Sequence, residues 1–221
     1  MRVGIIGAGR VGGNAARLLA KAGHEVKLSF TRDPANLDFA AREIGERASA
    51  GTPAAAVAFG EVVVFSVPWS VVPEALEQAG SLRGKIVIDT TNQFGVGPMP
   101  ADGQTAAQFN VARMPGARYT KTFNTLTSGF QAAAAGRTGA ERVVQWTCGD
   151  DEGAKQVVAG LVDDAGFQAV DLGGTASCAV MEAPRRAGAV YGEEYRLEDA
   201  RAVLDALRAG RPIPPTPAYP N

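Results

Sequence analysis

Three glycines near the start of the chain have the spacing of a phosphate-binding turn. Gly7, Gly9 and Gly12 follow a short apolar stretch at residues 3–6 and open a segment with apolar residues at helical spacing. In such a turn the first glycine permits a tight bend, the second lets the backbone approach a pyrophosphate, and the third lets the helix pack on the strand. The N-terminus of the helix then favours an anion. The pattern predicts a site for the pyrophosphate of an NAD(P)-type cofactor, and a tight turn without a ligand is the alternative.

The residues after the second predicted strand, at 25–30, indicate which dinucleotide is bound. An NAD-binding fold usually presents a carboxylate to the ribose at this point. Here Thr31 and Arg32 follow the strand, and a hydroxyl with a guanidinium suits a 2'-phosphate. Asp33 is a possible ribose ligand, but its place before Pro34 favours a helix cap. We therefore favour NADP over NAD.

Val67, Pro68 and Trp69 follow the predicted central strand at 62–67. Ligands of open α/β sheets bind where the strand order reverses, and this turn is expected at that point. Pro68 cannot extend the strand and turns the chain across the cofactor. Trp69 has two equal interpretations, because it can stack near the ribose or nicotinamide or pack on its own domain.

Polar side chains follow two further predicted strands, at residues 85–89 and 119–123. Asn92 comes after the first, and Asn124 and Thr125 come after the second. Since the carboxyl ends of parallel strands meet at one edge, these groups are expected to lie together and to orient a carboxamide and a second ring. Capping of the following helices is the alternative, and we favour the binding site.

The elements that position these residues alternate between strands and helices. Short runs rich in Val and Ile alternate with segments of helical periodicity, which predicts a Rossmann-type, doubly wound, mostly parallel sheet of about eight strands. Strands are also expected at 143–147 and 168–172, and helices at 11–22, 73–80, 152–165 and Leu197–Arg208. Thr52 and Pro53 signal another helix start. The proline-rich end at 212–220 should be extended. We divide the chain into a nucleotide-binding domain at 1–150 and a C-terminal α/β extension at 151–221.

Composition excludes several other functions. The chain has 221 residues and a formal net charge of -1, which gives no electrostatic basis for binding nucleic acid or an anionic membrane. No stretch is long enough for a membrane span and no secretory signal is evident, so a cytoplasmic protein is expected. His24 is the only histidine, and Cys148 and Cys178 are far apart in sequence, so no metal site is expected. We interpret the cysteines as buried or loop thiols.

Together these motifs resemble the NADP-dependent reductases of the deazaflavin coenzyme F420, and the cytoplasmic domains of the STEAP metalloreductases are similar. The likeness runs from Met1 to about Leu172. It rests on the glycine motif, Thr31-Arg32, Val67-Pro68-Trp69, Asp89-Thr90-Thr91-Asn92, Lys121-Thr122-Phe123-Asn124-Thr125 and Cys148-Gly149-Asp150-Asp151. After the last strand, only Glu182 matches the family's arginine, leucine and glutamate group. The resemblance implies NADP contacts from Gly9, Arg10, Val11, Thr31, Arg32, Pro68 and Leu126, with Asn124 and Thr125 facing the second ring.

The expected reaction is hydride transfer between NADP(H) and a deazaflavin (F420) or a flavin such as FMN or FAD. Two stacked rings need alignment more than proton transfer, so no catalytic acid or base is assigned. Lys121 is the one nearby proton donor, but it lies within a predicted strand. A β-hydroxyacid dehydrogenase is disfavoured because too few residues follow Cys148 for its helical domain. A non-catalytic NADP-binding redox sensor, with the proline-rich tail as a docking arm, is the second alternative. The expected partners are a small-molecule acceptor and a second copy of the chain in a homodimer.

Overall fold

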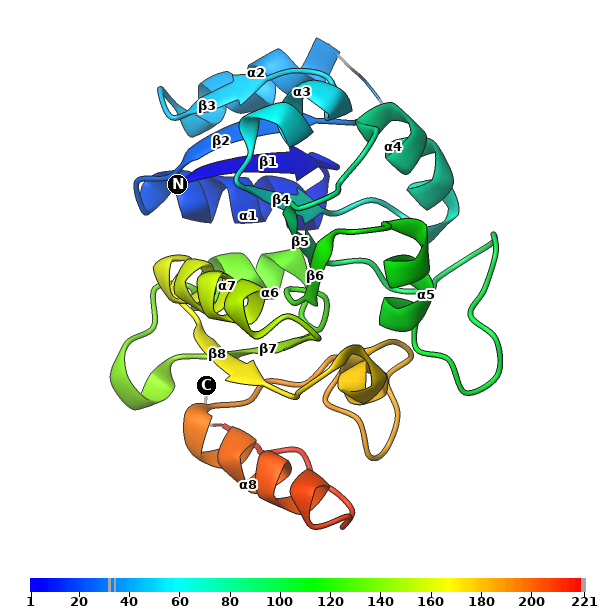
Figure 1. Cartoon of the computed structure of the whole chain (residues 1–221). Coiled ribbons are helices and arrows are strands. Elements are labelled where there is room, and N and C mark those ends of the chain that lie inside the picture. Colours follow the sequence, from blue (N-terminus) through cyan, green and yellow to red (C-terminus); the bar gives the residue numbers. More distant parts are fainter. Residues whose placement is uncertain (32, 34, 220–221) are drawn as a thin grey trace.

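A computed structural model describes residues 1–31, 33 and 35–219. It contains one sheet with the strand order β3-β2-β1-β4-β5-β6-β7-β8 (Figure 1). The strands are β1 Arg2–Ile6, β2 Glu25–Ser29, β3 Ala48–Ala50, β4 Val62–Phe65, β5 Ile86–Asp89, β6 Arg118–Lys121, β7 Val144–Gly149 and β8 Gln168–Asp171. All neighbours pair in parallel except β6 and β7, which are antiparallel. The predicted Rossmann-type α/β fold is confirmed.

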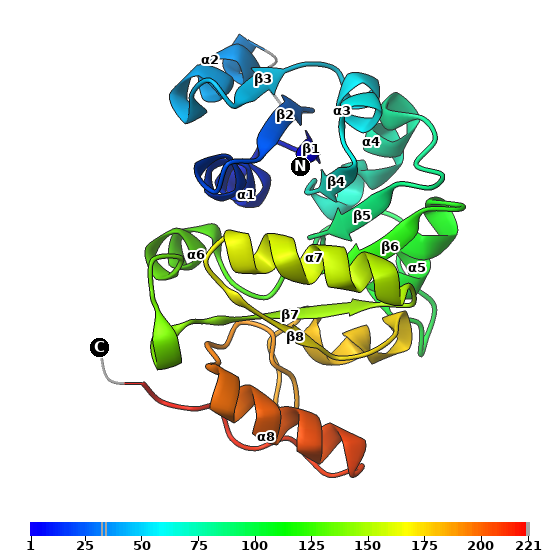
Figure 2. The same cartoon turned by 60° about the vertical axis from the view of Figure 1, so that its left-hand side comes forward.

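Helices cover both faces of this sheet, and the apolar core has a part on each face. The α-helices are α1 Arg10–Lys21, α2 Ala35–Ile44, α3 Pro53–Phe59, α4 Val72–Ala79, α5 Ala106–Arg113, α6 Ser128–Ala134, α7 Glu152–Asp164 and α8 Leu197–Arg208. Short 3-10 helices are η1 Trp69–Val71, η2 Gly139–Glu141 and η3 Thr175–Met181. One part of the core includes residues of α3, α4, α5, η3 and α8, and the other includes residues of α1, α2, α6 and α7 (Figure 2).

The central strand shows why its sequence is apolar without interruption. Val63 and Phe65 of β4 enter one part of the core, whereas Val62 and Val64 enter the other. Successive side chains of a strand point to opposite faces, so a strand that is covered on both faces needs apolar residues at every position. All four side chains are fully buried.

Local signals explain where the helices begin. Thr52 caps α3 by accepting a hydrogen bond of 3.1 Å from the N–H of Ala55, and Pro53 is the first helical residue. This start was predicted and is confirmed. The start of α5 was not predicted individually, although Thr105 and Gln108 form a reciprocal capping box there. Strand β3 was also not predicted.

The C-terminal part adds β8 to the sheet and then packs α8 beneath it (Figure 1). The tail after α8 has no helix or strand up to residue 219, as predicted. The hydroxyl of Tyr219 donates to Asp199 Oδ2 at 2.6 Å and accepts from the N–H of Arg196 at 2.9 Å. The tail therefore packs against its own chain. The proposed division at residue 150 stays a prediction.

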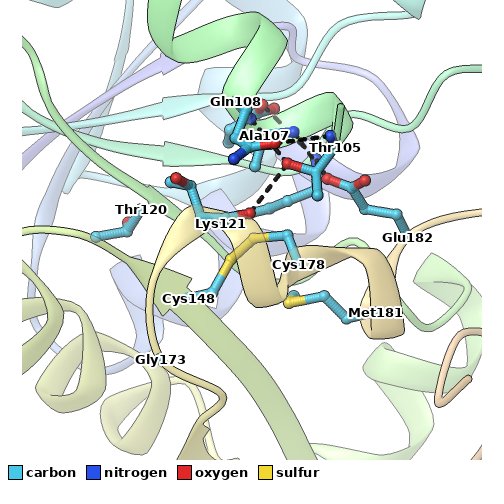
Figure 3. Close-up of a disulfide and its surroundings, with 12 residues drawn as sticks. Thr105, Ala107, Gln108, Thr120, Lys121, Cys148, Gly173, Cys178, Met181 and Glu182 are labelled. Atoms are coloured by element: carbon cyan, nitrogen blue, oxygen red, sulfur yellow. Dashed lines mark hydrogen bonds and ion pairs between the residues drawn. A yellow bond between two sulfur atoms is a disulfide. The ribbon is translucent and has the colours of Figure 1, made fainter. Parts of the chain in front are cut away.

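The two cysteines are bonded to each other, so the interpretation of Cys148 and Cys178 as free thiols is wrong. A disulfide joins the end of β7 to η3, with the two Cα atoms 6.1 Å apart (Figure 3). Both residues are buried, as expected. Their separation in sequence says nothing about the contact, because β7 and η3 meet only in the folded sheet. In the described part of the chain, no helix combines the length and apolar character needed to cross a bilayer.

Candidate active site

The strand order reverses between β1 and β4, and the turns after these two strands lie side by side. The N–H of Ser66, after β4, donates to the carbonyl of Ile6 at 2.8 Å. A Cβ on Gly7 would collide with the carbonyl of Ser66 and with Val67. The predicted position of Val67 and Pro68 at the switch point is therefore correct, and Pro68 is exposed there.

The three glycines of the motif have different roles. Gly7 has a φ of 102°, which other residues rarely adopt. A Cβ on Gly12 would collide with the carbonyl of Gly7, so Gly12 permits the close contact between α1 and β1. A Cβ on Gly9 would meet nothing within 4 Å. Packing within the described residues therefore does not require glycine at this position, so access for a ligand stays the predicted reason for it.

The N-terminus of α1 is free to bind an anion. Gly9 is the N-cap residue and has no side chain, so it cannot cap the first turn itself. The N–H groups of the first turn have no partner inside the helix, and Arg10, Val11 and Gly12 provide them. Arg10 is exposed and Val11 is half-buried. These groups and the dipole of α1 form a suitable site for a pyrophosphate.

The end of β2 has a strained backbone just before the predicted 2'-phosphate ligands. Phe30 adopts a φ of 56°, which is uncommon for a residue with a side chain and is typical of functional turns. Thr31 follows it and is half-buried, whereas Arg32 lies outside the described residues. The carboxylate of Asp33 accepts from the N–H of Ala35 at 3.1 Å, as a residue at a helix start does. This contact favours the capping interpretation of Asp33.

Trp69 packs within its own domain, which was one of its two interpretations. Its side chain is 2% exposed, and its indole N–H donates to the carbonyl of Pro98 at 2.9 Å. Phe109 stacks on it at 5.8 Å between ring centroids, and the guanidinium of Arg113 lies over the same ring. Leu126 is also part of the core, where it packs on the side of α1. Both side chains are therefore part of the apolar core of the protein.

The predicted polar edge is assembled as expected. Asn92 Nδ2 donates to the carbonyl of Asn124 at 2.9 Å, and Asn124 Nδ2 donates to Asn92 Oδ1 at 3.2 Å. Phe123, just before Asn124, has a φ of 59°, so the end of β6 is strained like the end of β2. Asn124 Nδ2 also donates to the carbonyl of Met181 at 2.8 Å. The C-terminal part thus holds this edge in place.

Several buried polar atoms in the two segments of this edge have no hydrogen-bond partner among the described residues. They are Gln93 Oε1, Thr122 Oγ1, Asn124 Oδ1 and Thr125 Oγ1. A buried polar atom without a hydrogen bond costs about 1–3 kcal/mol, so such atoms usually have a function. Asn124 and Thr125 follow β6 at the same carboxyl edge of the sheet as the switch point, and a bound ring is the partner that we propose for them.

The comparisons with known proteins agree with this geometry. Residues 2–93 match the family described as NADP oxidoreductase, coenzyme F420-dependent. The chain is an NADP-dependent oxidoreductase. Over residues 2–93, the resemblance that the motifs predicted is therefore confirmed. A comparison with curated proteins finds no match.

Solved structures resemble most of the chain. A hypothetical protein of Sinorhizobium meliloti shares 26% identity with a TM-score of 0.77, over 89% of this chain and 95% of its own. A protein of Arthrobacter sp. FB24, provisionally named an F420-dependent NADP reductase, shares 28% identity with a TM-score of 0.67, over 80% and 86%. A reductive aminase of Aspergillus terreus, at 24% identity and a TM-score of 0.59, matches 80% of this chain but 56% of its own and shows the fold alone.

Sequence reasoning missed a buried ionic cluster behind the polar edge of the oxidoreductase. Lys121 is fully buried, and its Nζ donates to the carbonyl of Thr91 at 2.6 Å. The same ammonium lies 3.7 Å from both Asp89 Oδ2 and Glu182 Oε1. Tyr119 donates to Asp89 at 2.6 Å, and burial followed by the charge of Asp89 raises the pKa of Tyr119 well above its usual range. The ammonium of Lys121 therefore lies between two carboxylates in the interior.

Glu182 joins this cluster to the start of α5. Its two carboxylate oxygens accept from the N–H groups of Ala106 and Ala107, both at 2.8 Å (Figure 3). The helix dipole also favours a carboxylate at this position. Glu182 follows η3 directly, so it ties the C-terminal part of the oxidoreductase to the sheet edge. The one signal in the sequence was its match to the family's glutamate.

Proposed function

We propose that this oxidoreductase transfers a hydride between NADP(H) and a planar ring acceptor, a deazaflavin first and a flavin second. The observation that supports this most directly is the polar edge, where Asn92 and Asn124 interlock and Asn124 Oδ1 and Thr125 Oγ1 remain without partners. NADPH supplies the hydride when it is bound. The chain supplies alignment, which is the main requirement of transfer between stacked rings.

The residues of the chain divide this work among three sites. The backbone at Arg10 and Val11 binds the pyrophosphate, with Gly9 leaving room for it. Thr31 and Arg32 bind the 2'-phosphate. Asn124 and Thr125 orient the rings at the edge of the sheet, and the strained backbone at Phe123 fixes their direction.

The ionic cluster excludes Lys121 as the proton donor for reduction of a simple carbonyl compound. Reduction of a ketone usually needs a positioned proton donor such as His, Lys or Tyr. Lys121, the donor considered from the sequence, is fully buried and already bonded to the carbonyl of Thr91 and paired with two carboxylates. Its proton is therefore held within the core.

Turnover with defined acceptors tests the proposal. NADPH oxidation is followed at the nicotinamide absorbance band, without oxygen, after addition of coenzyme F420, FMN or FAD, or a panel of aliphatic carbonyl compounds. We expect oxidation with F420, weaker oxidation with the flavins and none with the carbonyl compounds. Oxidation by the carbonyl compounds alone would overturn the proposal, and binding of NADPH without turnover of any acceptor would favour the redox-sensor alternative.

A further inference from the structure

An aromatic pair lies next to the polar edge, and nothing described so far explains it. The rings of Phe94 and Tyr191 are 6.2 Å apart between centroids and are tilted by 58°. The N–H of Phe94 donates to the carbonyl of Asn92 at 2.8 Å. The N–H of Gly192, the residue after Tyr191, donates to the carbonyl of Thr125 at 2.9 Å. The backbone at or next to each ring is therefore hydrogen-bonded to the backbone of a residue at the polar edge.

This pair differs from the other aromatic pairs among the described residues. In those pairs at least one ring is buried in the core, as Trp69, Phe123 and Tyr195 are. The side chain of Phe94, by contrast, is 54% exposed, and Tyr191 is only half-buried. Exposed apolar surface that forms a patch marks a place where a protein, a membrane or a ligand binds.

The polar atoms at the edge define the chemistry of that ligand. Asn124 Oδ1 can only accept, so it needs an N–H or O–H donor, whereas Thr125 Oγ1 can either donate or accept. The aromatic rings in turn favour a planar ligand that stacks on them. A heteroaromatic ring with N–H and C=O groups along one side has both properties, and an aliphatic carbonyl compound has neither.

We propose that Phe94 and Tyr191 form the aromatic part of the acceptor site and select a planar heteroaromatic ring with a hydrogen-bonding edge. This inference rests on the proposed function, because it assigns the place and the class of the acceptor. The two rings determine the affinity for the acceptor. NADPH binds at the turn that contains Gly9, so its affinity does not depend on the rings.

Truncation of the two rings tests the assignment. Phe94→Ala and Tyr191→Ala should each raise the KM for the ring acceptor, and the dissociation constant of the oxidised acceptor on the NADP-loaded protein, by about tenfold. Phe94→Trp should restore both values. The dissociation constant of NADPH should stay within about twofold of wild type in every variant. Phe39→Ala, which removes another exposed phenylalanine, on α2, is the matched control and should change none of these quantities.

The outcomes separate this inference from the proposed function. If wild-type protein turns over no ring acceptor, the proposed function fails. If it does turn over an acceptor but Phe94→Ala and Tyr191→Ala leave acceptor binding unchanged, this inference alone is wrong. A change in oligomeric state without a change in acceptor binding would likewise overturn it and assign the rings to an interface between copies of the chain.

Discussion

Gly7 and Gly9 belong to one motif, but the contacts around them separate turn geometry from ligand access. We predict that Gly9→Ala folds normally, because its Cβ meets no protein atom, yet binds NADPH at least about tenfold more weakly because that Cβ occupies the approach to the pyrophosphate. Gly7→Ala should instead lose at least about 1–3 kcal/mol of stability, since its φ is 102° and its Cβ would also collide with the carbonyl of Ser66. Thermal unfolding and a fluorescence titration with NADPH measure both effects. Normal affinity in folded Gly9→Ala would place the ligand elsewhere.

Arg32 carries the prediction on cofactor choice. A hydrogen bond to a charged group contributes about 1.5–3 kcal/mol, so Arg32→Ala should weaken NADPH binding about 10- to 100-fold and leave NADH binding nearly unchanged. Arg17→Ala, which removes a cation from the middle of α1, serves as the control for net charge. Titrations with both cofactors provide the measurement. Equal losses for NADPH and NADH would rule out a 2'-phosphate contact at Arg32.

The role of a residue was easier to predict from the sequence where it depends on local geometry than where it depends on burial. The glycine turn and the Asn92–Asn124 edge follow from motifs at the ends of strands, where topology alone brings them together. Trp69 and Lys121 were left open because their role depends on packing against distant segments. Pro98 accepts the indole N–H of Trp69, and Glu182 lies beside the ammonium of Lys121.

At the scale of elements, Glu182 is the link between η3, α5 and β6. Glu182→Ala would leave the N–H groups of Ala106 and Ala107 without their acceptor, while Lys121 would keep Asp89 as its partner. We predict a loss of about 1–3 kcal/mol in the free energy of unfolding, because these N–H groups become unsatisfied. Urea unfolding measures it, and Glu198→Ala on the exposed face of α8 is the control, expected to stay within about 0.5 kcal/mol of wild type. A loss no larger than that of the control would mean that the cluster does not stabilise this part of the fold.

Most elements could be predicted because their apolar periodicity and caps are local. Strand β3 has only Ala48, Ser49 and Ala50, which carry no strand signal, and it forms because β2 offers it a parallel neighbour. The antiparallel direction of β7 has no local signal in the sequence either, since the apolar pattern of a strand does not depend on its direction in the sheet. Such features depend on tertiary pairing, which a single sequence does not reveal.

For the molecule as a whole, the disulfide between Cys148 and Cys178 lowers the conformational entropy of the unfolded chain. Its sequence separation of 30 corresponds to about 3.6 kcal/mol of stability in the loop-closure model. Reductant should therefore lower the free energy of unfolding by about this amount. Unfolding in urea with and without reductant measures the effect, and the double variant Cys148→Ser, Cys178→Ser should be insensitive to reductant. Two thiols that react with alkylating reagent in the native, unreduced protein would contradict the bond.

The reversal at β7 means that the sheet consists of two parallel blocks, β3 to β6 and β7 to β8, joined along a seam. The seam has only two rows in register, Thr120 with Gly149 and Lys121 with Cys148. The second row carries both reinforcements of the fold, because Lys121 holds the ionic cluster and Cys148 holds the disulfide. Of these two, only the ion pair between Lys121 and Glu182 connects the two sides of the seam, whereas the disulfide joins β7 to η3 on one side of it. Reduction of the bond releases β7 from η3, so the amides of β7 and β8 should exchange with solvent ahead of those in β1 and β4.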